Sequence, residues 1–109
     1  MIETEIRDLL AAPADGVDAP PLARIEDALT AGYAQALALE AERWRIERRI
    51  AEVAGGLADE STTETSELRK LGSSLKKANG DLSTLRALLL SLRERASAIR
   101  TAAALTSAR

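Results

Sequence analysis

Two long stretches of the sequence place apolar residues at alternating steps of three and four, a spacing that suits helices packed along a seam. In the first stretch the seam positions are Leu22, Ile25, Leu29, Gly32, Ala36, Leu39, Arg43, Ile46, Ile50, Val53 and Leu57. In the second they are Leu68, Leu71, Leu75, Ala78, Leu82, Leu85, Leu89, Leu92, Ala96, Ile99 and Ala103. Because each phase is kept over many turns, the pattern predicts two long helices that pair as an antiparallel coiled-coil hairpin.

Glycine and capping residues place the expected ends of these helices. Gly55-Gly56 is typical of a helix stop, and Ser61 with Glu64 has the spacing of a capping box. We therefore expect a helix at about 21–55, a turn at about 55–61 and a helix at about 62–106. Asn79-Gly80 leaves an alternative open, since a break there would give three helices; the unbroken heptad phase favours continuity.

Composition supports an all-α fold of one small domain. The chain of 109 residues lacks Phe, His and Cys, and Trp, Tyr and Met occur once each. Its main residues, Ala, Leu, Glu and Arg, are strong helix formers. Without Cys or His there is no disulfide, no thiolate chemistry and no E-x-x-H metal motif. We expect no cofactor, no metal site and no enzymatic activity, in a cytoplasmic protein.

Residues 1–19 differ from the rest of the chain. Ile2, Ile6, Leu9 and Leu10 indicate a short amphipathic helix, and a proline-rich linker follows, in which Pro21 can occupy the first position of the next helix. This segment is acidic and lacks the continuous apolar run of a signal peptide, and we expect no membrane span. We interpret residues 1–19 as a separable arm and residues 20–109 as the hairpin.

The two predicted helices can be aligned in an antiparallel register in which the numbers of two facing residues always sum to 121. Gly32 then faces Leu89, and Arg43 faces Ala78, so that a small residue meets a large one. On the flank of the seam, this register brings Glu26 near Arg93. We expect Arg43 to fix the register, because a polar residue in a seam specifies alignment while lowering stability.

Several apolar residues lie outside the seam. Tyr33, Leu37, Ala41 and Trp44 form a second stripe on the first helix, and Leu88 and Leu90 are surplus on the second. A bare two-helix hairpin lacks an interior, so either a second hairpin or the N-terminal helix folded back must cover it. We expect a homodimer that forms a four-helix bundle, with a partner interface of Tyr33, Leu37, Trp44, Leu88 and Leu90. A groove for a different protein partner is the alternative.

Charge gives a second hypothesis about function. Residues 1–60 carry 6 Lys/Arg against 13 Asp/Glu, and residues 61–109 carry 9 against 4, so the two halves have opposite net charge. The basic half and the cluster Arg43, Arg45, Arg48 and Arg49 could bind an anion or nucleic acid. However, interleaved glutamates favour a salt-bridged helix face, and the acidic half can neutralise the basic one. The sequence therefore favours a structural or adaptor protein over a weak nucleic-acid or anion binder.

Overall fold

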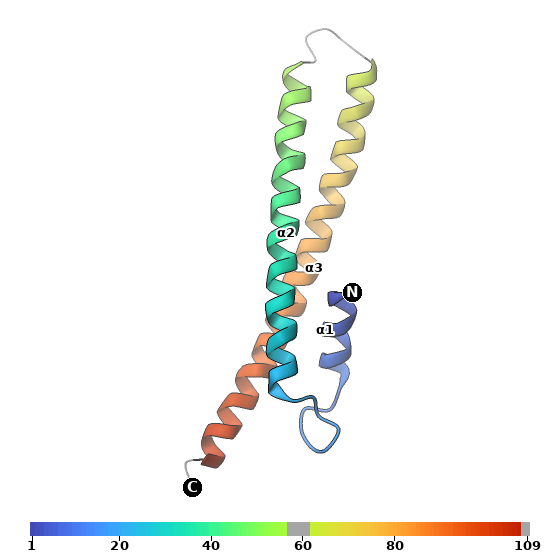
Figure 1. Cartoon of the computed structure of the whole chain (residues 1–109). Helices are drawn as coiled ribbons and strands as arrows, with labels where there is room; N and C mark the ends of the chain where they lie inside the picture. Colours follow the sequence, from blue (N-terminus) through green and yellow to red (C-terminus); the bar gives the residue numbers. More distant parts are fainter. Residues whose placement is uncertain (57–61, 108–109) are drawn as a thin grey trace. The chain divides into compact units, whose positions relative to one another are not determined.

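The computed structural model describes residues 1–56 and 62–107, and these form three α-helices and no strand (Figure 1). They are α1 (Ile2–Ala11), α2 (Leu22–Gly55) and α3 (Thr62–Ser107). The predicted all-α class is confirmed. None of these helices combines the length and the apolar character that a membrane span requires.

The helix ends follow the capping chemistry of the sequence. The Pro21 carbonyl accepts hydrogen bonds from the Arg24 and Ile25 N–H groups, which places Pro21 just before α2 and not at its first position. At the other end the Gly56 N–H donates to the Val53 carbonyl, so α2 ends at the predicted diglycine. Leu57 and the proposed cap Ser61 lie outside the described residues.

Helix α3 passes through Asn79-Gly80 without a break, as the heptad phase predicted. A glycine inside a helix costs about 1 kcal/mol relative to alanine. The neighbouring seam residues Ala78 and Leu82 are buried on one side of this helix. Burying them favours the helical phase over the turn that Asn-Gly prefers elsewhere.

The chain divides into two compact units, each of which draws on α2 and α3. Unit 1 contains residues 1–36 and 84–109, and unit 2 contains residues 37–83. This division does not follow the expected boundary at residue 19, because α1 belongs to unit 1 together with parts of both long helices.

Unit 1 has a three-helix core. Its buried side chains come from all three helices: Ile6 and Leu9 on α1, Ile25, Ala28, Leu29 and Ala36 on α2, and Leu85, Leu89, Leu92 and Ala96 on α3. In Figure 1, α1 lies alongside the long helices within this unit. The N-terminal segment is folded back onto the core of unit 1, and the interpretation of residues 1–19 as a separable arm stays a prediction.

Two contacts define how α2 and α3 face each other in unit 1. A methyl group added to Gly32 would collide with the Leu89 side chain, which agrees with the predicted pairing of these two positions. Glu26, earlier on α2, forms an ion pair of 3.3 Å with Arg100, later on α3, so the helices run in opposite directions here. The expected partner of Glu26 was Arg93, and that prediction was wrong by two helical turns. Arginine is long enough to reach along the flank, so seam register alone does not select its partner.

Unit 2 is less well covered. Val53, Ala78 and Leu82 are buried, whereas most of its seam is only half-buried: Leu39, Ile46, Ile50, Leu68, Leu71 and Leu75. Arg43 occupies its predicted seam position, yet its side chain remains 34% exposed and pairs with Glu47 at 3.7 Å. Arg43 is therefore not a buried charge, because the seam here is open enough for its guanidinium to reach solvent.

Candidate interaction surfaces

The most exposed large apolar side chains of unit 2 lie on one face of α2. Leu37 is 66% exposed and Trp44 is 60% exposed. They are two helical turns apart, and since two turns span about seven residues they point the same way. The Arg48 guanidinium lies 5.4 Å from the centre of the Trp44 ring, a cation–π distance. We call Leu37, Trp44 and Arg48 the Trp44 patch.

Small residues border the open seam of unit 2. Gly72 on α3 is exposed, and a Cβ added to it would meet no atom within 4 Å. Ala51 and Ala54 on α2 are also exposed. Small side chains cannot screen Ile50, Leu71 and their half-buried neighbours from water. The seam of unit 2 is thus accessible to another apolar surface.

Unit 1 exposes two further residues of the predicted interface, Tyr33 at 43% and Leu90 at 54%. Leu88, by contrast, is half-buried. Positions 88 and 90 are about 200° apart around a helix. Leu88 shares its side of α3 with Arg95, which contacts α1, so we assign Leu88 to the packing of α1. Leu88 and Leu90 therefore lie on different sides of α3, and their place together in one partner interface stays a prediction.

Arg95 is a structural residue that the sequence did not single out. One nitrogen of its guanidinium, Nη1, donates hydrogen bonds to the Leu9 carbonyl at 3.1 Å and to the Ala12 carbonyl at 2.9 Å. These carbonyls lie at the C-terminal end of α1, where a cation favours the helix dipole and the last carbonyls lack helical partners. Helix α1 has no basic residue of its own in its last turn. That absence is the only signal in the sequence for a donor from elsewhere.

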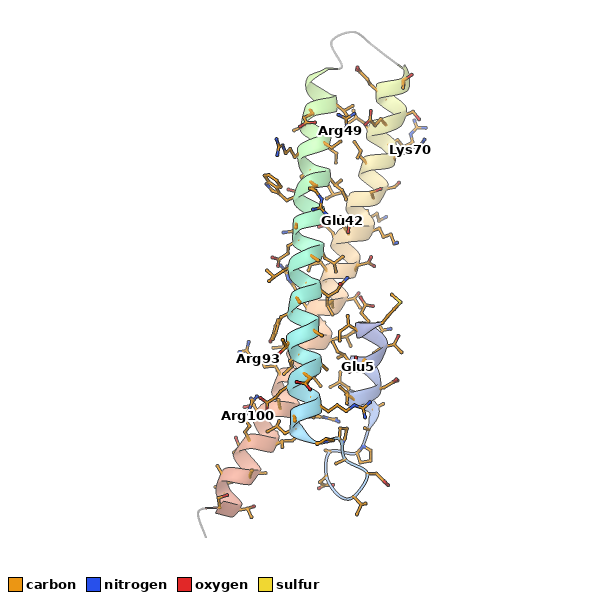
Figure 2. The ribbon with its side chains drawn as sticks, in the orientation of Figure 1. Glu5, Glu42, Arg49, Lys70, Arg93 and Arg100 are labelled. Atoms are coloured by element: carbon orange, nitrogen blue, oxygen red, sulfur yellow. The ribbon has the colours of Figure 1, made fainter. Side chains whose placement is uncertain are left out.

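The arginine cluster of α2 is engaged with glutamates. Arg48 lies 3.6 Å from Glu52, and Arg49 forms a 2.7 Å ion pair with Glu67 of α3. Figure 2 shows Arg49 between the two helices of unit 2. The hydrogen bond to Glu67 and the charge of that carboxylate raise the pKa of Arg49 above its usual value. The predicted salt-bridged helix face is confirmed, and an anion that binds here has to displace these carboxylates.

Among the described residues, a further polar feature lies on α3. A shallow hollow is lined by Thr63, Ser66, Glu67 and Lys70, which all belong to α3, and its carboxylate is the one that Arg49 binds. In the described part of the chain no three carboxylates gather as a metal site. Interaction surfaces are therefore the features from which a function can be argued.

Comparisons of the chain with known protein families, curated proteins and solved structures give no match.

Proposed function

We propose that this protein is a non-enzymatic association module: an antiparallel helical hairpin with a coiled-coil seam that pairs with a second copy to form a four-helix bundle. It would act as a structural or adaptor element that presents helix faces to other proteins. In this proposal α2 and α3 pair at their seam positions in both units and so form one hairpin.

The half-buried seam of unit 2 is the observation that carries the proposal. In unit 1 the third helix α1 covers the seam, whereas among the described residues of unit 2 only α2 and α3 contribute. A large apolar side chain gains about 1.5–3 kcal/mol when it is fully buried. Six half-buried seam residues therefore favour a further layer, and Leu37 and Trp44 add exposed apolar surface on another face of α2.

A second copy is the occupant that fits this surface. Trp and Tyr are enriched in the cores of protein interfaces, where a charged rim surrounds them. Trp44 has charged neighbours of this kind. The Arg48 guanidinium lies over its ring, and Glu47 is three residues further along the helix. Both signs of charge occur around the patch, so two copies related by a two-fold axis can align acidic with basic groups.

The single tryptophan provides a direct test. Trp44 is the only Trp in the chain, so its emission reports this surface alone. On dilution from about 100 μM to about 0.1 μM, which spans the usual range of weak dimers, the emission should shift to longer wavelength as the dimer dissociates. Light scattering should show the mass fall from two chains to one over the same range. A monomer mass at the highest concentration would contradict the dimer.

A matched pair of variants separates the patch from general helix stability. Leu37→Glu should give monomers, because a carboxylate cannot be buried without a partner. Ala38→Glu adds the same charge at the next position, which is exposed and lies about 100° around the helix from Leu37. It should leave the dimer intact. If both variants dissociate equally, the Trp44 patch is not the interface.

A further inference from the structure

Part of α3 in unit 2 carries a local excess of positive charge. Residues 68–80 contain four basic side chains and no acidic one: Arg69, Lys70, Lys76 and Lys77. All four are exposed, and we call them the basic strip. Residues 61–109 carry nine bases in all, so almost half of these bases lie within about three turns of one helix.

The basic strip lies on the side of α3 that faces away from the seam. Leu71, Leu75 and Ala78 mark the seam of α3 here, and they are buried or half-buried. At about 100° per residue, each base of the strip lies at least about 100° around the helix from the centre of this seam. Figure 2 shows Lys70 pointing away from α2, whereas Arg49 lies between the two helices. Among the described residues of unit 2 only α2 and α3 contribute, so this face of α3 stays open to solvent.

The strip differs from the arginine cluster of α2 in its ion pairing. Arg48 and Arg49 are held by Glu52 and Glu67. In the part of the chain that the structure describes, no base of the strip forms an ion pair or a hydrogen bond. The nearest acidic neighbours along α3 are Glu67, which Arg49 already binds, and Asp81, which follows the last lysine of the strip. A phosphate that binds the strip therefore does not have to displace a paired carboxylate of the described residues.

We propose that the basic strip binds the phosphate backbone of double-stranded DNA, without regard to base sequence. This function goes beyond the association module proposed above, and it uses a helix face that neither the seam nor the Trp44 patch includes. Binding is favourable because neutralising the phosphates releases the counterions that surround them. Lysine and arginine are the side chains that supply this neutralisation.

The arrangement of the four bases suits a duplex. Arg69 and Lys76 are seven positions apart, so they share a side of the helix and form one row. Lys70 and Lys77 form a second row, about 100° around α3 from the first. A helix with its side chains is about 10–12 Å across, and the major groove of DNA is about 12 Å wide. Ser73 lies between the rows and is too small to hold the helix away from the groove, so the two rows can reach phosphates on both strands.

Other polyanions fit the strip less well. Single-stranded nucleic acid is bound through stacking on aromatic side chains, and the only two aromatic residues of the chain, Tyr33 and Trp44, lie on α2. A helix on a membrane surface buries an apolar face, but the apolar face of α3 in unit 2 is its seam. Protein interfaces usually depend on aromatic or apolar anchors at their centre, and the strip has none. A DNA duplex is therefore the partner that the strip fits best.

Salt-dependent binding tests the proposal on the intact chain. The probe is a fluorescein-labelled duplex of about 20 base pairs, and anisotropy gives its Kd between about 50 mM and about 200 mM salt. Four phosphate contacts should give a Kd of about 1–100 μM at the lower salt and a slope of log Kd against log salt of about 3.6. Two duplexes of unrelated sequence should bind equally, because phosphate contacts carry no sequence information. An RNA duplex should bind more weakly, since its major groove is narrow.

A charge-matched pair of variants locates the site. Lys76→Gln with Lys77→Gln removes two bases of the strip, which should weaken binding about tenfold or more at the lower salt and reduce the slope by about 1.8. Arg24→Gln with Arg45→Gln removes the same charge from two exposed positions of α2 and should change the Kd less than twofold. Lys76→Arg with Lys77→Arg keeps the charge and should keep the binding. Circular dichroism checks that every variant remains helical.

Three results would overturn the proposal. The first is no rise in anisotropy with about 100 μM of the chain at the lower salt. The second is equal weakening by the strip variant and the α2 variant, which would mean that overall charge attracts the duplex. The third is tighter binding to polyglutamate, or to vesicles of equal parts phosphatidylcholine and phosphatidylserine, which would assign the strip to an acidic protein or to a membrane. Light scattering of the unbound chain reports the dimer separately, so the two proposals can fail independently.

Discussion

Units 1 and 2 are built from the same two helices with the same heptad pattern, yet their seams are buried to different extents. In unit 1, Leu85, Leu89 and Leu92 are covered almost completely. In unit 2, Leu68, Leu71 and Leu75 occupy equivalent positions of α3 and stay half-exposed. The difference is the short helix α1, which adds a third side to the core of unit 1.

The comparison shows what a two-helix seam can and cannot do. Two helices pack along a line, so each seam residue keeps an open side, and a third element is needed to enclose it. In unit 1 the chain supplies that element itself. In unit 2 the described residues do not, which is why we look for its cover in a second molecule.

Leucine truncation should give the largest contrast between the units. Leu85→Ala removes a fully buried side chain and should lower the free energy of unfolding by about 2–5 kcal/mol. Leu71→Ala removes a half-buried one and should cost about 1 kcal/mol, half of the usual burial gain. Urea unfolding of both variants at low protein concentration measures the difference. If a dimer covers unit 2, the cost of Leu71→Ala grows with concentration, and equal costs at high dilution would contradict the comparison.

The next largest effect concerns the contact that fixes α1 in unit 1. Arg95→Ala removes two charge-assisted hydrogen bonds and should reduce the free energy that holds α1 by about 1.5–3 kcal/mol. Hydrogen exchange should quicken at α1 amides and stay unchanged at those of unit 2. Arg93→Ala is the control: Figure 2 places Arg93 on the side of α3 away from Glu5 of α1. If hydrogen exchange at the α1 amides quickened equally in both variants, Arg95 would not be the residue that holds α1.

Glycine substitutions sharpen the comparison at the level of about 1 kcal/mol. Gly80→Ala in unit 2 adds a methyl group with no atom within 4 Å, so it should stabilise α3 by about 0.5–1 kcal/mol. Gly32→Ala in unit 1 meets Leu89 and Ile6, and the crowding should cancel that gain or exceed it. Thermal unfolding of the two variants checks the sign. A clear rise in melting temperature for Gly32→Ala would mean that the core of unit 1 has spare room.

The smallest effect is expected at Arg43. Its ion pair with Glu47 is partly exposed and is worth about 0.3–0.5 kcal/mol. Arg43→Leu replaces it with an apolar side chain at a half-buried seam position and should raise the free energy of unfolding by up to about 1 kcal/mol. Arg45→Leu, at an exposed position, should have no such effect. Light scattering tests whether Arg43 fixes how the chains associate. A mixture of masses for Arg43→Leu but not for Arg45→Leu supports this role, and a single unchanged mass for Arg43→Leu argues against it.

The sequence by itself determined the helices and the face that each one buries. Apart from Ala103, every seam residue that it predicted within residues 1–56 and 62–107 is buried or half-buried. Ala103 is exposed because the register that pairs Gly32 with Leu89 carries it past the start of α2 at Leu22. The stop at Gly55-Gly56 and the passage through Asn79-Gly80 were predicted as well. These features depend on spacing and capping within one helix, which a sequence records directly.

Only the tertiary structure decided where α1 packs, which arginine pairs with Glu26, and why Leu88 and Arg95 matter. The amphipathic pattern of residues 2–11 indicates that one face needs cover, but many apolar faces could supply it. The position of α1 depends on Gly32 allowing Ile6 to approach and on Arg95 reaching carbonyls more than 80 residues away in the chain. Such choices depend on how distant surfaces fit together in space, and neither spacing nor composition encodes that fit.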